Sequence, residues 1–287
     1  MKFCLYVPPF GPYADALTLA KLARNAEDAG WDGFFIWDHI AGERYPETIV
    51  DPWVALTAIA LNTKKIRIGA LVTPLPRRRP WKVARETVSL DHLSGGRLVF
   101  GAGIGSGLGE FDNLGEEADP IKRGEMLDEG LDILTGLWKG KSFNYDGKYY
   151  RVKATLFLPP PVQTPRIPIW VAGIWPHKAP FRRAARWDGL FPLFADPSQN
   201  TLKEFERLVD FVKTKRQEDT PFDILFRGAD LPVDDPERVG EIIKPYAKLG
   251  VTWWQVNLNP VNFGGELKGK WPVEAMHQRV LQGPPRI

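Results

Sequence analysis

Eight short apolar segments alternate with amphipathic segments along the chain, and this alternation limits the fold more than any other feature of the sequence. The segments expected to form strands are 3–7, 33–37, 66–72, 97–102, 168–172, 189–194, 223–227 and 252–258. Most are continuous apolar runs, which are typical of parallel strands covered on both faces. Alternating strands and helices form either an open doubly wound sheet or a closed barrel. The number of strands favours an α/β fold of the (β/α)8 TIM barrel type.

Helix signals fill the gaps between these strands. An apolar stripe within residues 19–26 is followed by Gly30, where a left-handed residue commonly ends a helix. Asp51 and Asp119 each precede a proline, which combines an N-cap side chain with the residue best suited to the first helical position. Further helices are expected near 82–93, 178–186, 201–216, 236–248 and 273–281.

One stretch, residues 140–167, departs from the alternation. Asp146 and Gly147 stand between aromatic residues and form a good hairpin turn, and a proline-rich segment follows them. We expect an insertion here, between strands 4 and 5, that forms a lid or a rim element. The chain of 287 residues is therefore expected to be a single barrel domain over residues 1–287.

Charge and composition argue against several classes of protein. A net charge of +3 is too small to indicate a nucleic-acid-binding protein. No apolar run is long enough for a membrane-spanning helix, and the first apolar run is too short for a signal peptide. The single cysteine, Cys4, excludes an internal disulfide and fits a reducing compartment. We expect a cytoplasmic protein without a nucleic-acid or membrane partner.

Two familiar kinds of site are poorly supported. The four histidines do not fall at the spacings of metal ligands, so we expect no metal site. Ser106 does not stand in a G-x-S-x-G motif, which argues against an α/β-hydrolase.

His39 is the strongest catalytic candidate. It directly follows the strand at 33–37, and the C-terminal ends of the strands carry the catalytic groups of TIM barrels. An imidazole can accept or donate a proton near neutral pH. A histidine that only satisfies neighbouring backbone groups explains the position equally well.

Three loops offer weaker signals for a bound anion. The glycine run at 101–109 could let a ligand approach the backbone, although it does not match G-x-G-x-x-G and a flexible loop explains it as well. The arginines at 77–79 could hold an anionic cofactor tail or an acidic substrate, or they could be solvated. The turn at 173–178 could bind phosphate at a helix start, or it could be an ordinary turn.

Four segments together resemble the luciferase-like flavin-dependent oxidoreductase family, which includes bacterial luciferase, FMN monooxygenases and enzymes that use coenzyme F420. These segments are 26–39, 68–74, 90–103 and 184–189. In this order and spacing they are specific, and the resemblance runs along nearly the whole chain. It implies a (β/α)8 barrel with an insertion after strand 4 and a flavin-type cofactor, FMN or F420, at the C-terminal mouth.

The resemblance also implies roles for individual residues. His39 matches a proton donor beside the reactive ring, and Ala70-Leu71 matches a bulge with a non-proline cis peptide behind that ring. The other residues implied to line the cofactor are Asp38, Thr73, Ile104 and Gly105, with Gly173, Trp175 and Lys178 near its phosphate. Ser106 stands where some F420-dependent sugar dehydrogenases have a glutamate base, so their chemistry is not implied.

The expected function is a flavin-dependent oxidoreductase or monooxygenase that acts on a small organic substrate. FMN would involve oxygen and a partner flavin reductase, whereas F420 would involve hydride transfer without oxygen; both stay open. A homodimer is expected by family analogy. The alternatives are a non-catalytic flavin-binding barrel and a non-redox barrel enzyme acting on phosphorylated metabolites. Tryptophans expected near the rim hint at an apolar or planar substrate, although packing explains them equally well: Trp37, Trp175, Trp253 and Trp254.

Overall fold

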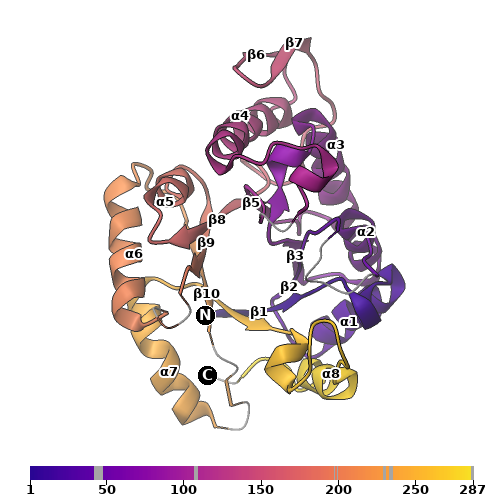
Figure 1. Cartoon of the computed structure of the whole chain (residues 1–287), viewed down its shortest axis with the longest axis vertical. Helices are drawn as coiled ribbons and strands as arrows, with labels where there is room; N and C mark the ends of the chain where they lie inside the picture. The colour runs from indigo at the N-terminus through magenta and orange to yellow at the C-terminus, as the bar shows by residue number, and fades with distance from the viewer. Residues whose placement is uncertain are drawn as a thin grey trace.

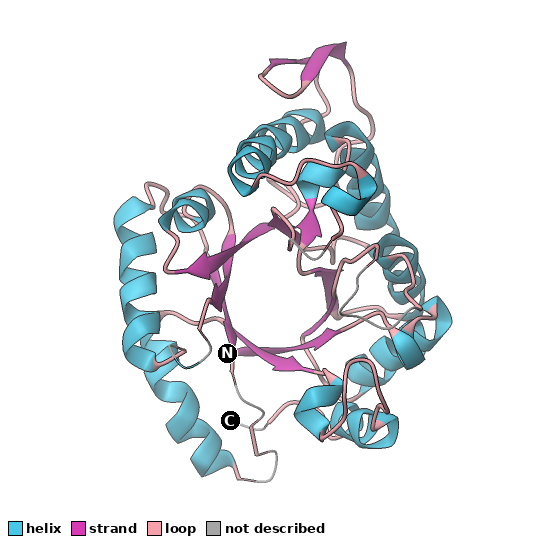
Figure 2. Cartoon of the chain, viewed as in Figure 1, coloured by secondary structure: helices cyan, strands magenta, loops and turns pink. Residues whose placement is uncertain are grey.

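The computed structural model describes residues 1–41, 48–106, 109–196, 198, 200–228, 231–232 and 235–285. An inner ring of strands is surrounded by helices (Figures 1 and 2). The ring strands are β1 (Lys2–Val7), β2 (Gly33–Ile36), β3 (Arg67–Ala70), β4 (Thr73–Pro74), β5 (Phe100–Gly103), β8 (Ile169–Trp175), β9 (Gly189–Phe194), β10 (Asp223–Arg227) and β11 (Trp253–Asn257). The helices are α1 (Ala16–Asp28), α2 (Pro52–Asn62), α3 (Pro80–Ser94), α4 (Pro120–Trp138), α5 (Lys178–Ala184), α6 (Leu202–Lys215), α7 (Pro236–Leu249) and α8 (Val273–Leu281).

The described strands form a nearly closed parallel barrel in the order β3-β2-β1-β11-β10-β9-β8-β5-β4. β3 and β4 are two parts of one barrel strand, interrupted at Leu71 and Val72. A parallel bridge between Ile68 and Leu98 brings β3 against the chain that enters β5, so the ring returns on itself. The (β/α)8 TIM barrel predicted from the sequence is confirmed, and the open doubly wound sheet is excluded.

The expected helix starts and strand positions agree closely with the structure. The carboxylate of Asp51 accepts hydrogen bonds from the amides of Trp53 and Val54, and that of Asp119 accepts one from Ile121, as N-caps do. The apolar stripe of α1 is buried against the barrel. None of the helices in the described part of the chain has the length and apolar run needed to cross a membrane.

The inside of the barrel is filled by side chains rather than hollow. One cluster of buried residues occupies it: Cys4, Phe35, Leu71, Val99, Trp170, Phe191, Leu225 and Trp253. A larger cluster fills the layer between strands and helices. Because the interior is packed, a ligand can bind only at the two ends of the barrel.

The expected insertion forms an antiparallel hairpin of β6 (Phe143–Asp146) and β7 (Arg151–Thr155). It projects beyond α4, outside the ring, so it is a rim element and not a lid over the opening (Figure 1). The predicted turn at Asp146-Gly147 is wrong, because Asp146 pairs with Arg151 and the loop covers residues 147–150. Glu129 of α4 fixes the conformation of this loop by accepting hydrogen bonds from three of the loop amides.

Candidate active site

Five charged or titratable side chains meet at the C-terminal end of the barrel. Asp38 and His39 follow β2, Arg77 and Arg78 lie in and after the short helical turn behind β4, and Glu110 lies in the loop after β5. Parallel barrel strands all end on the same side, which is why residues so distant in sequence come together.

A hydrogen bond between His39 and Glu110 is the centre of this group. His39 Nδ1 lies 3.0 Å from Glu110 Oε2. Glu110 Oε1 also accepts hydrogen bonds from the amides of Ile40 at 2.6 Å and Ala41 at 3.1 Å. An ionised carboxylate can only accept, so Nδ1 carries the proton and Nε2 is the basic nitrogen of the neutral ring. Glu110 therefore fixes both the tautomer and the position of the imidazole.

Two arginines neutralise the acidic residues of the group. Arg77 bridges both carboxylates, with Nη1 3.0 Å from Glu110 Oε2 and Nη2 2.8 Å from Asp38 Oδ1. Arg78 Nη2 lies 3.0 Å from each oxygen of Asp38. Neither expectation for the arginine loop describes these two residues, because their charges are paired inside the protein rather than solvated or offered to a ligand. Such charge-assisted pairs hold the ends of β2, β4 and β5 together.

Glu110 stays ionised although its side chain is only 1% exposed. Burial by itself raises the pKa of this carboxyl, but the hydrogen bond and charge of His39, the charge of Arg77 and the amide of Ile40 outweigh burial and lower the pKa to about 2. A carboxyl with this pKa does not exchange protons near neutral pH. Glu110 therefore acts as a fixed hydrogen-bond acceptor that positions the imidazole of His39.

The residues expected to line a cofactor differ in their burial and in their hydrogen-bond partners. Asp38 is buried, and the arginines occupy its carboxylate, so it supports the neighbouring loop. Thr73 is fully buried, and its hydroxyl has no hydrogen-bond partner in the described chain. The non-proline cis peptide lies between Leu71 and Val72, one bond after the expected Ala70-Leu71. The hydroxyl of Tyr6 donates to the carbonyl of Leu71.

Close packing explains the first half of the glycine run. A Cβ on Gly101 would lie 2.2 Å from the carbonyl oxygen of Ala70, and one on Gly103 would lie 2.4 Å from Val72 Cγ2. These glycines let β5 approach the interruption between β3 and β4. Gly105 has a φ of +80°, and Ile104 beside it is half-buried. Residues 107 and 108 lie outside the described chain.

The turn after β8 faces the helices more than the mouth. The Trp175 ring is buried against Phe181 of α5, and its Nε1 donates to Glu204 of α6. The ammonium of Lys178 lies 3.6 Å from the centre of the Trp175 ring. The Trp175 ring is thus held between α5 and α6, and its contact with a cofactor stays a prediction. A Cβ on Gly173 would meet the side chains of α5, so helix packing explains this glycine.

Of the tryptophans expected at the rim, Trp37 is the one placed near His39. Its ring centre lies 6.0 Å from that of His39 and 5.4 Å from that of Tyr6. Trp253 begins β11 and lies at the opposite end of the barrel interior. Trp254 faces outward and packs against Tyr246 of α7. The expectation of a rim position was wrong for Trp253 and Trp254.

A cavity of about 710 Å³ opens at the same end of the barrel as His39. It is lined by Ile174, Pro192, Leu193, Phe194, Ala195, Asn200, Phe226, Arg227, Gly228, Asn257 and Asn262. Most of these residues stand at or just beyond the ends of β8 to β11. Its volume lies in the range of pockets that bind small molecules and cofactors.

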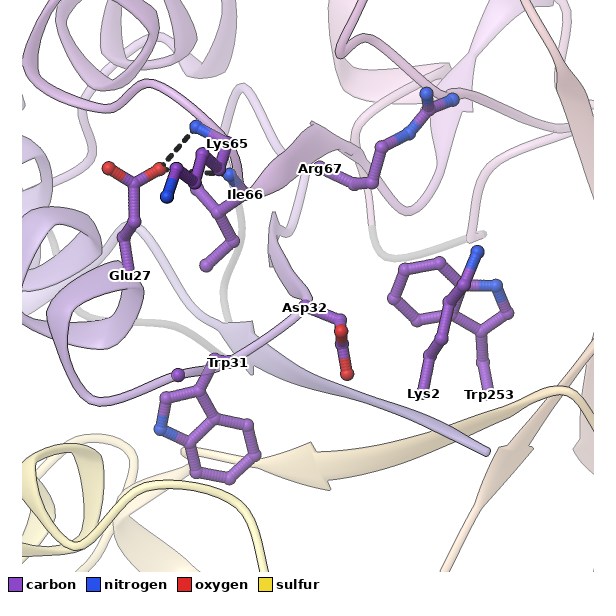
Figure 3. Close-up of a pocket in the computed structure, with 9 residues that line it drawn as sticks. Lys2, Glu27, Trp31, Asp32, Lys65, Ile66, Arg67 and Trp253 are labelled. Atoms are coloured by element: carbon purple, nitrogen blue, oxygen red, sulfur yellow. Dashed lines mark hydrogen bonds between the residues drawn. The ribbon is translucent and has the colours of Figure 1, made fainter.

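A second cavity, of about 420 Å³, lies at the opposite end of the barrel (Figure 3). Of its two acidic residues, Glu27 accepts hydrogen bonds from the amides of Lys65 and Ile66, as the dashed lines show, and Asp32 accepts one from the amide of Phe3. Lys2 lies over the ring of Trp253. Residues at this end of a TIM barrel usually serve stability rather than catalysis. The chemistry is therefore assigned to the other end.

No three His, Cys, Asp or Glu side chains gather to hold a metal ion anywhere in the described ranges. The candidate site thus consists of one histidine, two paired carboxylates and two arginines, with a cavity at the same end of the barrel. Sequence analysis singled out His39 but missed Glu110. The place of Glu110 in the loop after β5 gives no local sign of its hydrogen bond to His39, which is 71 residues away in the sequence.

Fold and site define an α/β-barrel protein with a histidine at the mouth. Residues 2–253 match the family model described as luciferase-like monooxygenase, so the chain belongs to this family. It is 33% identical over 237 residues to an uncharacterised protein of Mycobacterium tuberculosis, covering 74% of this chain and 78% of the relative. It is 31% identical over 157 residues to an F420-dependent glucose-6-phosphate dehydrogenase of Microbacterium testaceum, covering 53% of this chain and 45% of that enzyme.

Solved structures share the fold at low sequence identity. The coenzyme F420-dependent tetrahydromethanopterin reductase of Methanopyrus kandleri has a TM-score of 0.73 at 18% identity and covers 98% of this chain and 96% of its own. A monooxygenase of Streptomyces bottropensis has a TM-score of 0.70 at 20% identity, with the same coverage. These similarities confirm the luciferase-type barrel and leave the reaction open.

Proposed function

We propose that this protein is an oxidoreductase that binds FMN or F420 at the C-terminal mouth and acts on a small organic substrate, with His39 exchanging a proton with the reacting molecule. The observation that carries the proposal is the His39–Glu110 hydrogen bond, held by Arg77 at the end of β2. A carboxylate that fixes the tautomer and orientation of an imidazole is a recurring feature of histidines that exchange protons at active sites.

The residues on the β3 side of the mouth fit a planar redox ring. The interruption between β3 and β4 carries the Leu71–Val72 cis peptide and the half-buried Val72, and the buried hydroxyl of Thr73 has no hydrogen-bond partner among the described residues. Ile104 and Gly105 follow β5 next to them. When bound, F420 would supply hydride transfer, and reduced FMN would supply hydride transfer or oxygen activation.

The protein's own contribution is positioning and proton exchange. Asp38, Arg77 and Arg78 fix the strand ends, so the imidazole does not have to be ordered when substrate binds. Glu110 holds Nδ1–H of His39 by accepting its hydrogen bond. His39 Nε2 is then the atom that accepts or donates the proton. The surrounding rings of Phe10 and Trp37 limit the access of water.

The cofactor and the partners belong to this proposal as well. Names of relatives include F420-dependent enzymes, and a structural neighbour is a Baeyer–Villiger monooxygenase in complex with FMN, so both cofactors stay in the proposal. FMN would bring in a flavin reductase as a partner. We also propose that the protein forms a homodimer. Exposed apolar residues on α2, Val54 and Leu61, are consistent with a covered face.

Replacing His39 tests the proposal. His39→Ala is expected to leave the dissociation constants for FMN and F420 within about twofold, because the ring is bound by other residues. Turnover should fall by about 10²–10⁴-fold, the usual contribution of a general acid or base. Tryptophan fluorescence titrations measure binding, and cofactor absorbance follows turnover of a substrate found by screening. Glu206→Gln, an exposed change on α6, serves as the control.

Three outcomes of this experiment would redirect the proposal. Unchanged turnover in His39→Ala would remove this residue from the mechanism. Tight cofactor binding without turnover of any screened substrate would indicate a flavin-binding barrel that stores its ligand. Failure of the wild-type protein to bind either cofactor would favour a non-redox barrel enzyme.

A further inference from the structure

The cavity at the mouth has one charged residue on an otherwise neutral wall. Ile174, Leu193 and Phe194 give it apolar surface, and three asparagines give it polar surface. Among the described residues that line it, Arg227 is the one with a charge, and no acidic side chain accompanies it. A positive charge in a partly apolar concave site selects for an anionic ligand.

Asparagines, rather than a carboxylate, hold Arg227 in place. Asn257 is oriented so that its side-chain oxygen accepts a hydrogen bond from Arg227 Nη2 at 2.7 Å and its nitrogen donates to the carbonyl of Tyr6 at 3.3 Å. Asn200 donates to the carbonyl of Arg227 at 3.3 Å, and Asn262 donates to that of Asn257 at 3.0 Å. The guanidinium itself thus contacts one neutral side chain, Asn257, which does not cancel its charge.

Arg227 differs from the other arginines at this end of the barrel in how its charge is paired. Arg77 and Arg78 are paired with Asp38 and Glu110, so their charges are already compensated. Arg227 is exposed at the end of β10, and the described part of the chain gives it no acidic partner. A guanidinium presents five N–H donors in a planar fork that matches a carboxylate or phosphate.

The position of Arg227 points to substrate rather than cofactor. The residues that fit the redox ring follow β2, β3 and β5, whereas Arg227 and Asn257 end β10 and β11. Tyr6 of β1 lies between the two sides, since it contacts the Trp37 ring and its carbonyl accepts from Asn257. A molecule bound at Arg227 would thus extend toward His39 across Tyr6.

We propose that Arg227 determines specificity by binding the anionic group, a carboxylate or a phosphate, of a small substrate whose apolar part lies against Ile174, Leu193 and Phe194. This inference rests on the proposed function in one respect: the molecule bound at Arg227 is taken to be the substrate of the oxidoreductase. The anion site itself follows from the cavity and its charge.

Binding of simple probes tests the proposal without knowledge of the true substrate. Hexanoate, its neutral analogue hexanamide, and butyl phosphate are titrated into the cofactor-free protein by calorimetry or ligand-observed NMR. The wild type should prefer the anions over hexanamide. Arg227→Gln should weaken the binding of the preferred anion by about 10–100-fold and leave the binding of hexanamide unchanged. Arg227→Lys should retain part of the preference for the anion. Whichever of hexanoate and butyl phosphate binds more tightly shows whether the site prefers a carboxylate or a phosphate.

Arg182→Gln is the matched control, because it removes the same charge from an exposed position on α5. It should keep the full preference for anions. Equal binding of hexanoate, butyl phosphate and hexanamide to the wild type would overturn the proposal, as would an unchanged preference in Arg227→Gln. Thermal unfolding of each variant establishes that it is folded.

Cofactor titrations of the same variants separate this inference from the proposed function. Unchanged FMN and F420 affinity in Arg227→Gln supports a substrate role, whereas weaker cofactor binding would assign Arg227 to the cofactor's anionic tail and overturn it. If the wild type binds neither cofactor but still prefers the anions, the anion site is supported and the redox function is contradicted.

Discussion

At the scale of single residues, Glu110 determines what the site can do. Hydrogen bonds from His39, Ile40, Ala41 and Arg77 surround its carboxylate, so the ionised form is strongly favoured. The carboxylate therefore acts as a fixed acceptor, and in the proposed function proton exchange falls to the imidazole of His39. Glu110 is a positioning residue, and its contribution to stability should depend on pH in a defined way.

Glu110→Gln tests this dependence. The pKa of Glu110 in the folded protein, about 2, is below the value of about 4.5 for a free glutamate, so its stabilising effect is complete above pH 4.5 and lost as the pH falls to 2. We expect the variant to be less stable than the wild type by roughly 2–3 kcal/mol at pH 7, and the difference to shrink toward pH 2. Urea unfolding at several pH values measures it, with Glu206→Gln as control. A difference that is constant with pH would contradict this assignment.

At the scale of helices and strands, local patterns predicted most of the fold. Continuous apolar runs and proline-marked helix starts depend on neighbouring residues, so strands and helices were placed correctly to within a few residues. The failures depend on distant contacts. β5 begins at Phe100 rather than at 97, because Arg97 turns toward the end of α2. The hairpin loop is longer than predicted because Glu129 of α4 binds its amides.

Arg97 should contribute strongly to stability, because its hydrogen bonds connect the chain before β5 to the end of α2. Its buried guanidinium donates to the carbonyls of Ala60 at 2.8 Å and Thr63 at 3.0 Å, and to that of Ser94 at 2.7 Å. Arg97→Met leaves these acceptors without a donor and should lower the free energy of unfolding by about 3–5 kcal/mol, with a smaller loss for Arg97→Lys. Denaturant unfolding measures both variants. A loss below about 1 kcal/mol for Arg97→Met would show that other groups satisfy these carbonyls.

At the scale of the whole molecule, the barrel assembles the site from distant parts of the sequence. His39 could be predicted, because its place at a strand end is a local property. Glu110 could not, because its role depends on a partner 71 residues away that only the closed ring brings within reach. The same holds for Arg77, whose pairing with Asp38 requires β2 and β4 to end side by side. Barrel closure is thus a condition for the chemistry as well as for stability.

In the proposed function, a flavin-type ring binds at the C-terminal mouth against His39. A crystal structure of the protein soaked separately with FMN and with F420 tests it most directly. We expect density for the ring of at least one of them beside His39 and the Leu71–Val72 peptide, with Glu110 still hydrogen-bonded to the imidazole. Density for the ring at the opposite end of the barrel, or a mouth that stays empty at saturating concentrations of both cofactors, would contradict it.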